Sequence, residues 1–126
     1  MVCAVTVTIE EAAASWRRRE AERRERSAER AKILRSRLPA ARRLLMERYQ
    51  ATRVILFGSL ARGDLTERSD VDLAVEGLRH DGYFTAIADL TGLLDSPVDL
   101  VEIERATPSL LARLDLEGVV LGDSPP

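Results

Sequence analysis

Cysteine and histidine are almost absent from this sequence, since each occurs once, as Cys3 and His80. A single cysteine excludes a disulfide within the chain and fits a reducing compartment. The same scarcity excludes a zinc site built from Cys and His ligands, and it disfavours Ser-His-Asp and Cys-His triads. Any chemistry here therefore has to use carboxylates, hydroxyls and arginines.

Long apolar runs are also missing. No stretch of 18 or more apolar residues occurs, which argues against a membrane-spanning helix. The first residues, MVCAVTVTIEE, lack the basic segment and the long apolar stretch of a secretory signal. We therefore expect a cytoplasmic protein.

The length and composition suit one globular domain, but the charge is unevenly spread. The chain has 126 residues, of which 45% are hydrophobic and 32% charged, enough for a core. Residues 1–50 hold 13 Lys+Arg and seven Asp+Glu, whereas residues 51–126 hold six and 14. This asymmetry indicates either two functions or two partners, such as nucleic acid for the basic part and metal ions for the acidic part. The simpler interpretation is a solvated basic helix beside an acidic fold.

The N-terminal part is predicted to form a long helical arm. Residues 2–8 are mostly β-branched and favour a short strand. Thr8 with Glu11 has the form of a capping box, so a helix is expected from residue 9 to about residue 38. The arm is rich in Arg, Glu and Ala and therefore either protrudes into solvent or pairs with another helix through a narrow alanine seam. The seam would consist of Ala14, Ala21 and Ala28.

The remainder alternates helices and strands, which predicts an α/β (α+β) fold. Pro39 is expected to break the arm and to open a second helix. Helices are predicted at 40–50, 83–94 and 108–116, strands at 53–57, 71–75 and 98–103, and an edge strand at 118–121. Thr107-Pro108 is the expected start of the last helix. The inward face predicted for helix 83–94 consists of Phe84, Ile87, Leu90, Leu93 and Leu94.

A short segment after the first of these strands has the composition of a phosphate-binding loop. The strand ends at Gly58, where the missing Cβ allows a ligand to approach the backbone. Ser59 is expected to open one turn of helix that Gly63 ends, and free N–H groups at such a turn can bind phosphate. Arg62 can add positive charge. The alternative for Ser59 is an ordinary helix cap.

Three aspartates after this loop lie at positions where the predicted strands would bring their carboxylates close together. Asp70 and Asp72 are two residues apart at the start of a predicted strand, so both face the same side of it, and Asp99 interrupts a later apolar strand. Three carboxylates without His or Cys suit Mg²⁺ or Mn²⁺. Such a cluster facing a phosphate-binding loop is typical of two-metal phosphoryl or nucleotidyl transfer. The alternatives are a turn or cap role for Asp70 and a loop position for Asp99.

These residues resemble a known family. The order of a strand, Gly58-Ser59, a spacer of ten residues, Asp70-x-Asp72 and a later strand with Asp99 resembles the nucleotidyltransferase superfamily of the DNA polymerase β type. The form GSxARGDxxxxSDxDLxV resembles its minimal branch, the MNT-type proteins, over about residues 40–122. The resemblance implies a small mixed β-sheet flanked by helices. Three segments are then expected: a strand and helical arm at 1–38, the minimal nucleotidyltransferase domain at 39–122, and a frayed tail at 123–126.

The resemblance also implies a role for each residue of the motif. Gly58 and Ser59 would bind the triphosphate of ATP, with Arg62 and Gly63 as further members of the nucleotide-binding loop. The metal ions would be held by three carboxylates, those of Asp70, Asp72 and Asp99. Asp99 would in addition help to bind or deprotonate the acceptor hydroxyl. The implied reaction is attack of that hydroxyl on the α-phosphorus with loss of pyrophosphate.

The acceptor is expected on a partner. Residues 51–126 suffice for the sheet, its helices and the metal site, and leave no further domain for an acceptor. MNT-type proteins are commonly antitoxins of HEPN-family ribonuclease toxins and resemble AMP transferases that modify a toxin tyrosine with ATP, which is the leading hypothesis here. The alternatives are a non-catalytic binding antitoxin, a nucleotidyltransferase of a small molecule such as an aminoglycoside, and nucleic-acid binding by the arm. We favour a role of the arm in oligomerisation or partner docking.

Overall fold

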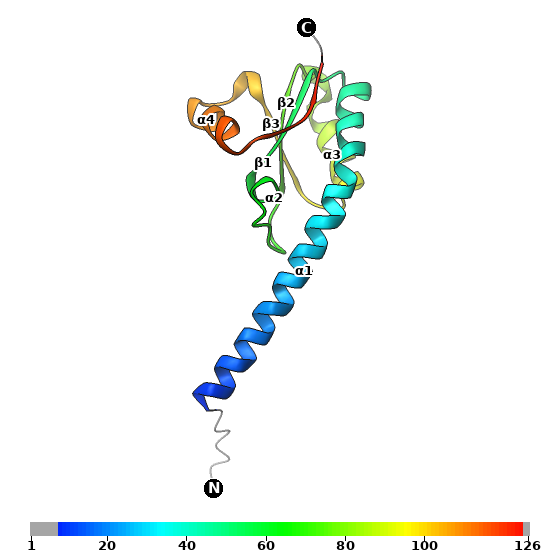
Figure 1. Cartoon of the computed structure of the whole chain (residues 1–126). Helices are drawn as coiled ribbons and strands as arrows, with labels where there is room; N and C mark the ends of the chain where they lie inside the picture. Colours follow the sequence, from blue (N-terminus) through cyan, green and yellow to red (C-terminus); the bar gives the residue numbers. More distant parts are fainter. Residues whose placement is uncertain (1–7, 125–126) are drawn as a thin grey trace.

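The structure is a computed structural model that describes residues 8–124. A four-stranded sheet with helices on both faces forms the globular part, and a long helix extends from it (Figure 1). In chain order the elements are α1 (Ile9–Arg43), a π-helical turn η1 (Leu44–Arg48), β1 (Arg53–Phe57), α2 (Gly58–Arg62), β2 (Val71–Glu76), a 3-10 turn η2 (His80–Gly82), α3 (Tyr83–Leu94), β3 (Val98–Glu102), a second 3-10 turn η3 (Ile103–Arg105), α4 (Pro108–Glu117) and β4 (Val119–Asp123). Within residues 8–124, no helix is long and apolar enough to cross a membrane.

Helix α1 begins as predicted but does not end where the sequence indicated. Thr8 accepts a hydrogen bond from the Glu11 N–H and the Glu11 side chain accepts from Thr8, so the capping box is confirmed. The predicted break at Pro39 is wrong, because α1 continues through this residue to Arg43. A proline inside a helix costs about 3 kcal/mol through its missing N–H and its ring. Here the buried stripe of the helix continues on both sides of it, and the packing of that stripe offsets the cost.

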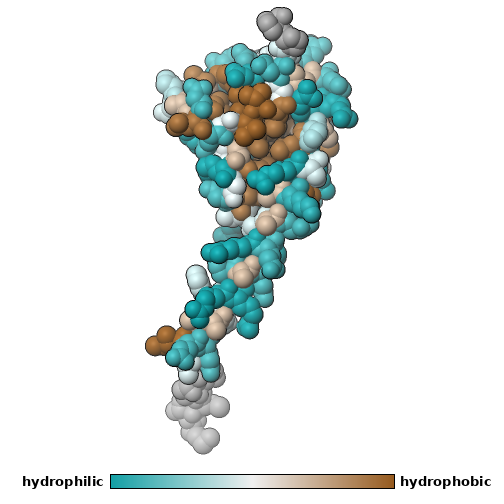
Figure 2. All heavy atoms as spheres, viewed as in Figure 1, coloured by the Kyte–Doolittle hydropathy of each residue, from teal (hydrophilic) through white to brown (hydrophobic). Residues whose placement is uncertain are grey.

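The buried stripe shows which part of α1 belongs to the globular core. The buried residues of α1 and η1 recur every three or four positions: Ala31, Leu34, Leu38, Ala41 and Leu45. Residues 9–26, in contrast, extend away from the sheet and present a mainly hydrophilic surface (Figures 1 and 2). The expected boundary at residue 38 thus falls inside a continuous helix whose last four turns are core.

The sheet has the mixed topology that the family resemblance implied. Its order is β3-β2-β1-β4, with β1 antiparallel to both β2 and β4, and with β2 parallel to β3. Helices α1 and α3 cover one face, where Leu73 and Leu100 are buried. Helix α4 covers the other face, where its Leu114 packs with Phe57 and Ala74.

Most of the other predicted elements are confirmed, with differences at Phe84 and in the last strand. Phe84 was expected to face inward in α3, but its side chain is 81% exposed. The last strand extends further than predicted, to Asp123, and the N–H of Ser124 donates to the carbonyl of Thr52. The cap formed by Thr107 with Pro108 in the first turn is present as expected. The strand predicted at 2–8 lies outside the described residues except for Thr8. The frayed tail predicted at 123–126 is wrong for Asp123 and Ser124, because β4 and the hydrogen bond to Thr52 hold them, and residues 125–126 lie outside the described residues.

The exposed part of α1 should be dispensable for folding, whereas its buried part should not. We expect deletion of residues 1–24 to change the melting temperature by only a few degrees, because no side chain in residues 8–24 is buried in the core. Deletion of residues 1–38 should unfold the protein, since each large core side chain contributes about 2–5 kcal/mol and Leu34 and Leu38 would both be lost. Thermal unfolding followed by circular dichroism checks both variants. Loss of cooperative unfolding in the variant without residues 1–24 would show that the exposed part of α1 is needed for folding.

Candidate active site

Two of the three predicted carboxylates, Asp72 and Asp99, lie in register on neighbouring strands, and Asp72 is on the face that α4 covers. Asp72 of β2 is paired with Phe57 of β1 on one side and with Asp99 of β3 on the other. Side chains alternate along a strand, so Asp72 shares its face with Ala74, which packs against α4. Asp70 precedes β2 by one residue and is exposed, as is Asp99 on the edge strand. The strand register therefore places Asp72 and Asp99 side by side, as the sequence predicted.

The charge of Asp72 is poorly compensated. Burial raises the pKa of this carboxyl, and the negative charges of Asp99 and then Asp70 raise the pKa further. The positive charges of Arg113 and Arg62 oppose this effect. Repulsion between carboxylates that the fold holds close together is a cost that a bound cation would remove.

The donor chemistry of this cluster fits a hard divalent cation. Carboxylate oxygens are the ligands that Mg²⁺ and Mn²⁺ prefer. Within residues 8–124, however, no three His, Cys, Asp or Glu side chains converge as a preformed metal site. Asp72 and Asp99 are the pair that the strands hold in register, and Asp70, just before β2, is close enough to raise the pKa of Asp72. The assignment of all three as metal ligands stays a prediction.

Gly58 joins the sheet to α2 and lies directly against Asp72. Its φ is +75°, a value that favours glycine, and a Cβ built on it would lie 1.9 Å from Asp72 Oδ2. Its N–H donates to Glu117 Oε1 at 3.1 Å. Helix α2 is a single turn that ends at Gly63, whose φ is +88°, as the sequence predicted. Ser59 is half-buried in this turn and is not its side-chain cap, so the alternative of an ordinary cap is wrong.

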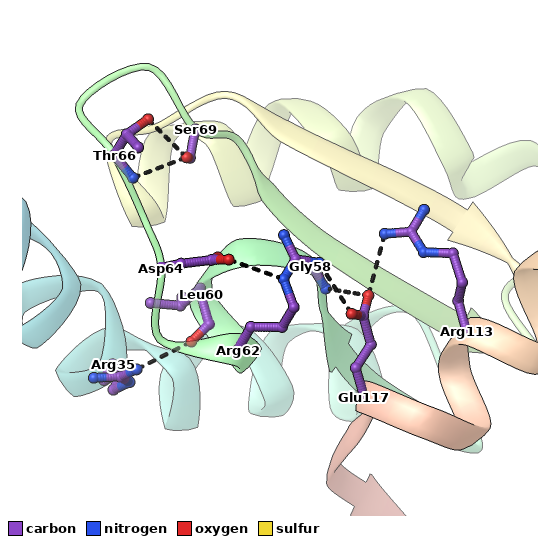
Figure 3. Close-up of polar contacts among 9 residues, drawn as sticks. All are labelled: Arg35, Gly58, Leu60, Arg62, Asp64, Thr66, Ser69, Arg113 and Glu117. Carbon is purple, nitrogen blue, oxygen red and sulfur yellow. Dashed lines mark hydrogen bonds and ion pairs between the residues drawn. The ribbon is translucent and has the colours of Figure 1, made fainter.

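An anion is already bound at this point of the structure, and it comes from the protein itself. The carboxylate of Glu117, the last residue of α4, lies between Gly58 and two arginines (Figure 3). Arg62 donates to Glu117 Oε2 at 3.0 Å, and Arg113 donates to Glu117 Oε1 at 3.1 Å. Arg62 also donates to Asp64 at 3.2 Å. The hydrogen bond from Arg62 lowers the pKa of Glu117 most, and those from Gly58 and Arg113 lower it further, against the effect of burial.

The loop between α2 and β2 is held by arginines of α1. Arg30 donates to the carbonyls of Thr66 and Ser69 and to the hydroxyl of Ser96, at 2.7–2.9 Å. Arg35 donates to the carbonyl of Leu60 in α2 at 3.0 Å (Figure 3). The second half of the predicted arm therefore positions the motif loop, in addition to contributing to the core.

Sequence reasoning missed Glu117 and Arg113 as members of this site. The two residues are four apart on a helix, a spacing that indicates only a surface ion pair. Nothing in the local pattern reveals that α4 packs across Phe57 and carries this pair to the end of β1. The only signal in the sequence was indirect. The donors at the end of β1, such as the Gly58 N–H and Arg62, need an acceptor, which a nearby carboxylate can supply.

The fold and this motif together define the family. The family model described as Polymerase beta, Nucleotidyltransferase matches residues 41–125. The chain belongs to this family, and its minimal branch, as the motif at 58–75 indicated.

Individual relatives agree with this assignment. A protein of Methanocaldococcus jannaschii, provisionally named a protein adenylyltransferase, is 40% identical over 63 residues. The match covers 48% of this chain and 64% of that relative, so it spans less than two thirds of the relative's length. A solved structure described provisionally as a minimal nucleotidyltransferase is 35% identical with a TM-score of 0.63, over 71% of this chain and 93% of that one. A chain in a solved toxin–antitoxin complex with AMP-PNP is 26% identical with a TM-score of 0.60, over 68% and 73% of the two chains.

Proposed function

We propose that this protein is a metal-dependent nucleotidyltransferase that transfers AMP from ATP to a hydroxyl of a partner protein. The partner is a HEPN-family toxin, the acceptor is one of its tyrosines, and the protein acts as the antitoxin of the pair. The observation that carries the proposal is the contact between Gly58 and Asp72. It joins the anion-binding donors of the motif and the paired carboxylates in one site.

The hydrogen-bond donors of this site suit the phosphates of a nucleoside triphosphate, and its carboxylates suit the cation that the phosphates bind. Gly58 N–H and Arg62 already bind a carboxylate, and a phosphoryl oxygen accepts the same hydrogen bonds. Asp70, Asp72 and Asp99 would hold Mg²⁺, which would neutralise charge on the phosphates and on the leaving pyrophosphate. The similarity to a chain from a complex with AMP-PNP supports ATP as the nucleotide.

The acceptor would approach along the exposed edge of the sheet. A groove of about 460 Å³ adjoins Asp99 and is lined by Tyr83, Phe84 and Arg105 among others. Phe84 is exposed, and its ring makes an edge-to-face contact with Tyr83, whose hydroxyl donates to the Leu100 carbonyl. An exposed aromatic ring beside a candidate base suits an aromatic acceptor, because rings stack or pack edge to face. This arrangement favours a tyrosyl hydroxyl over other acceptors.

The chemical step follows from these positions. Asp99 would accept the proton of the acceptor hydroxyl, whose oxygen attacks the α-phosphorus. The bond between the α-phosphorus and the bridging oxygen of the pyrophosphate breaks as the new P–O bond forms. Gly58 and Arg62 would hold the departing phosphates, so that the negative charge develops where donors are already oriented.

A titration of the toxin separates catalysis from simple binding. The ribonuclease activity of the toxin is followed after incubation with a small molar fraction of this protein, ATP and Mg²⁺. The proposal predicts inhibition that increases with time until all toxin is inactive, and no such progress with Asp70→Asn. Inhibition that stops at one molar equivalent and does not need ATP would instead show a binding antitoxin.

A further inference from the structure

Glu117 is bound where the proposed function places the phosphates of ATP. The Gly58 amide has one hydrogen, and in this structure Glu117 Oε1 accepts it. A nucleotide can use the same donor only if the glutamate leaves. The inference developed here rests on the proposed function and deepens it.

Arg113, the second arginine that contacts Glu117, lies where it can also contact a phosphate bound at Gly58. Arg113 lies over the ring of Phe57, with its guanidinium carbon 5.7 Å from the ring centre, and so extends from α4 to the residue before Gly58. Its side chain is 53% exposed, whereas that of Glu117 is 17% exposed. Its charge also reaches Asp72, whose pKa it lowers. The guanidinium therefore contacts Glu117, lies close enough to Asp72 to affect its pKa, and remains accessible from solvent.

The end of α4 at Glu117 is closely packed, so we expect its side chain rather than its backbone to move. The next residue is Gly118, whose N–H donates to the Leu114 carbonyl at 2.9 Å. A Cβ at Gly118 would lie 2.3 Å from that carbonyl oxygen and 2.8 Å from Ile55. This close packing anchors the end of α4 against β1. The carboxylate can exchange partners by rotation about its side-chain bonds while the helix stays in place.

We propose that Arg113 is a further triphosphate-binding residue and that Glu117 is an internal anion that occupies the phosphate-binding donors until a nucleotide displaces it. Carboxylates and phosphates both bind arginine through charge-assisted hydrogen bonds, so the exchange conserves the contacts of the donors. Displacement frees two arginines at once, and both then bind the incoming phosphates. The glutamate thus lowers the affinity for nucleotide and keeps the donors oriented in its absence.

Calorimetric titration with a non-hydrolysable ATP analogue and Mg²⁺ tests this proposal on the full chain. Glu117→Gln keeps the shape of the side chain and removes its charge, and the affinity should rise about tenfold, the effect of losing one charged competitor. Arg113→Gln should lower the affinity about tenfold. Asp115→Asn and Arg79→Gln are the matched controls, exposed residues of the same charges, and they should stay within twofold of the parent.

The possible outcomes separate this proposal from the proposed function. Nucleotide affinities that are equal in the parent, Glu117→Gln and Arg113→Gln would overturn the proposal while leaving nucleotide transfer in place. No binding by any variant would overturn both. A purely structural glutamate would lower the melting temperature when replaced and leave the affinity unchanged or weaker. The Gly58 amide resonance gives a readout without nucleotide, since the proposal requires it to shift in Glu117→Gln and not in Asp115→Asn.

Discussion

Replacing Gly58 by alanine is expected to destabilise the protein by about 2–5 kcal/mol and to abolish nucleotide binding. Two effects add. The backbone has a φ of +75°, which a residue with a Cβ adopts only at a cost. The new methyl group would also lie 1.9 Å from Asp72 Oδ2, so either the carboxylate or the strand end has to move. Both the amide donor and the proposed metal ligand are displaced.

Gly63→Ala is the matched control for this substitution. Gly63 has a similar φ of +88°, but a Cβ there would meet no atom within 4 Å. Its replacement should therefore cost only the conformational term, about 1–2 kcal/mol. Urea unfolding measures both free energies, and titration with an ATP analogue measures binding. Equal destabilisation by the two alanines would show that the contact between Gly58 and Asp72 is not as tight as described.

Replacing Asp72 by asparagine should lower the rate of transfer by about a thousandfold or more while leaving the protein at least as stable. The loss of activity follows from the removal of a proposed metal ligand. The gain in stability follows from the raised pKa of Asp72, because burial and the nearby carboxylates disfavour its charged form in the folded state. Replacing strained or charged active-site residues of this kind often raises the free energy of unfolding by about 0.5–2 kcal/mol.

The pH dependence gives this second prediction a definite sign. A folded-state pKa above the ordinary value of 3.8 means that the folded protein loses stability as Asp72 ionises. The loss begins as the pH rises past 3.8 and is complete above the raised pKa. Asp72→Asn should therefore match the parent in strongly acidic solution and exceed it near neutral pH. Asp81→Asn, at an exposed carboxylate, is the control. A variant less stable than its parent at pH 7 would contradict the argument.

The sequence predicted the motif and the strands well because both depend on local patterns. A short run of β-branched and apolar residues, ended by Gly58, is a strong strand signal. The capping residues Thr8 and Thr107 acted as expected, since a cap is made within one turn of its own helix. The family resemblance then supplied the mixed sheet, which the local pattern alone left open.

What could not be predicted depended on contacts between distant segments. Pro39 stays in a helix because its neighbours along the helix pack on the sheet, and this packing outweighs the local preference. Phe84 fits the helical period of an inward residue, yet it is exposed and lines the groove beside the edge strand β3. Glu117 and Arg113 entered the site only because α4 packs across β1. Each failure is a case in which tertiary structure decided against a local signal.

The most direct test of the central claim is the intact mass of the proposed HEPN-family partner after incubation with this protein, ATP and Mg²⁺. The account predicts that the partner gains one or more AMP units, that the gain maps to tyrosine, and that Asp70→Asn and Asp72→Asn abolish it. An unchanged partner mass, measured while the parent protein binds ATP and neutralises the toxin, would contradict it.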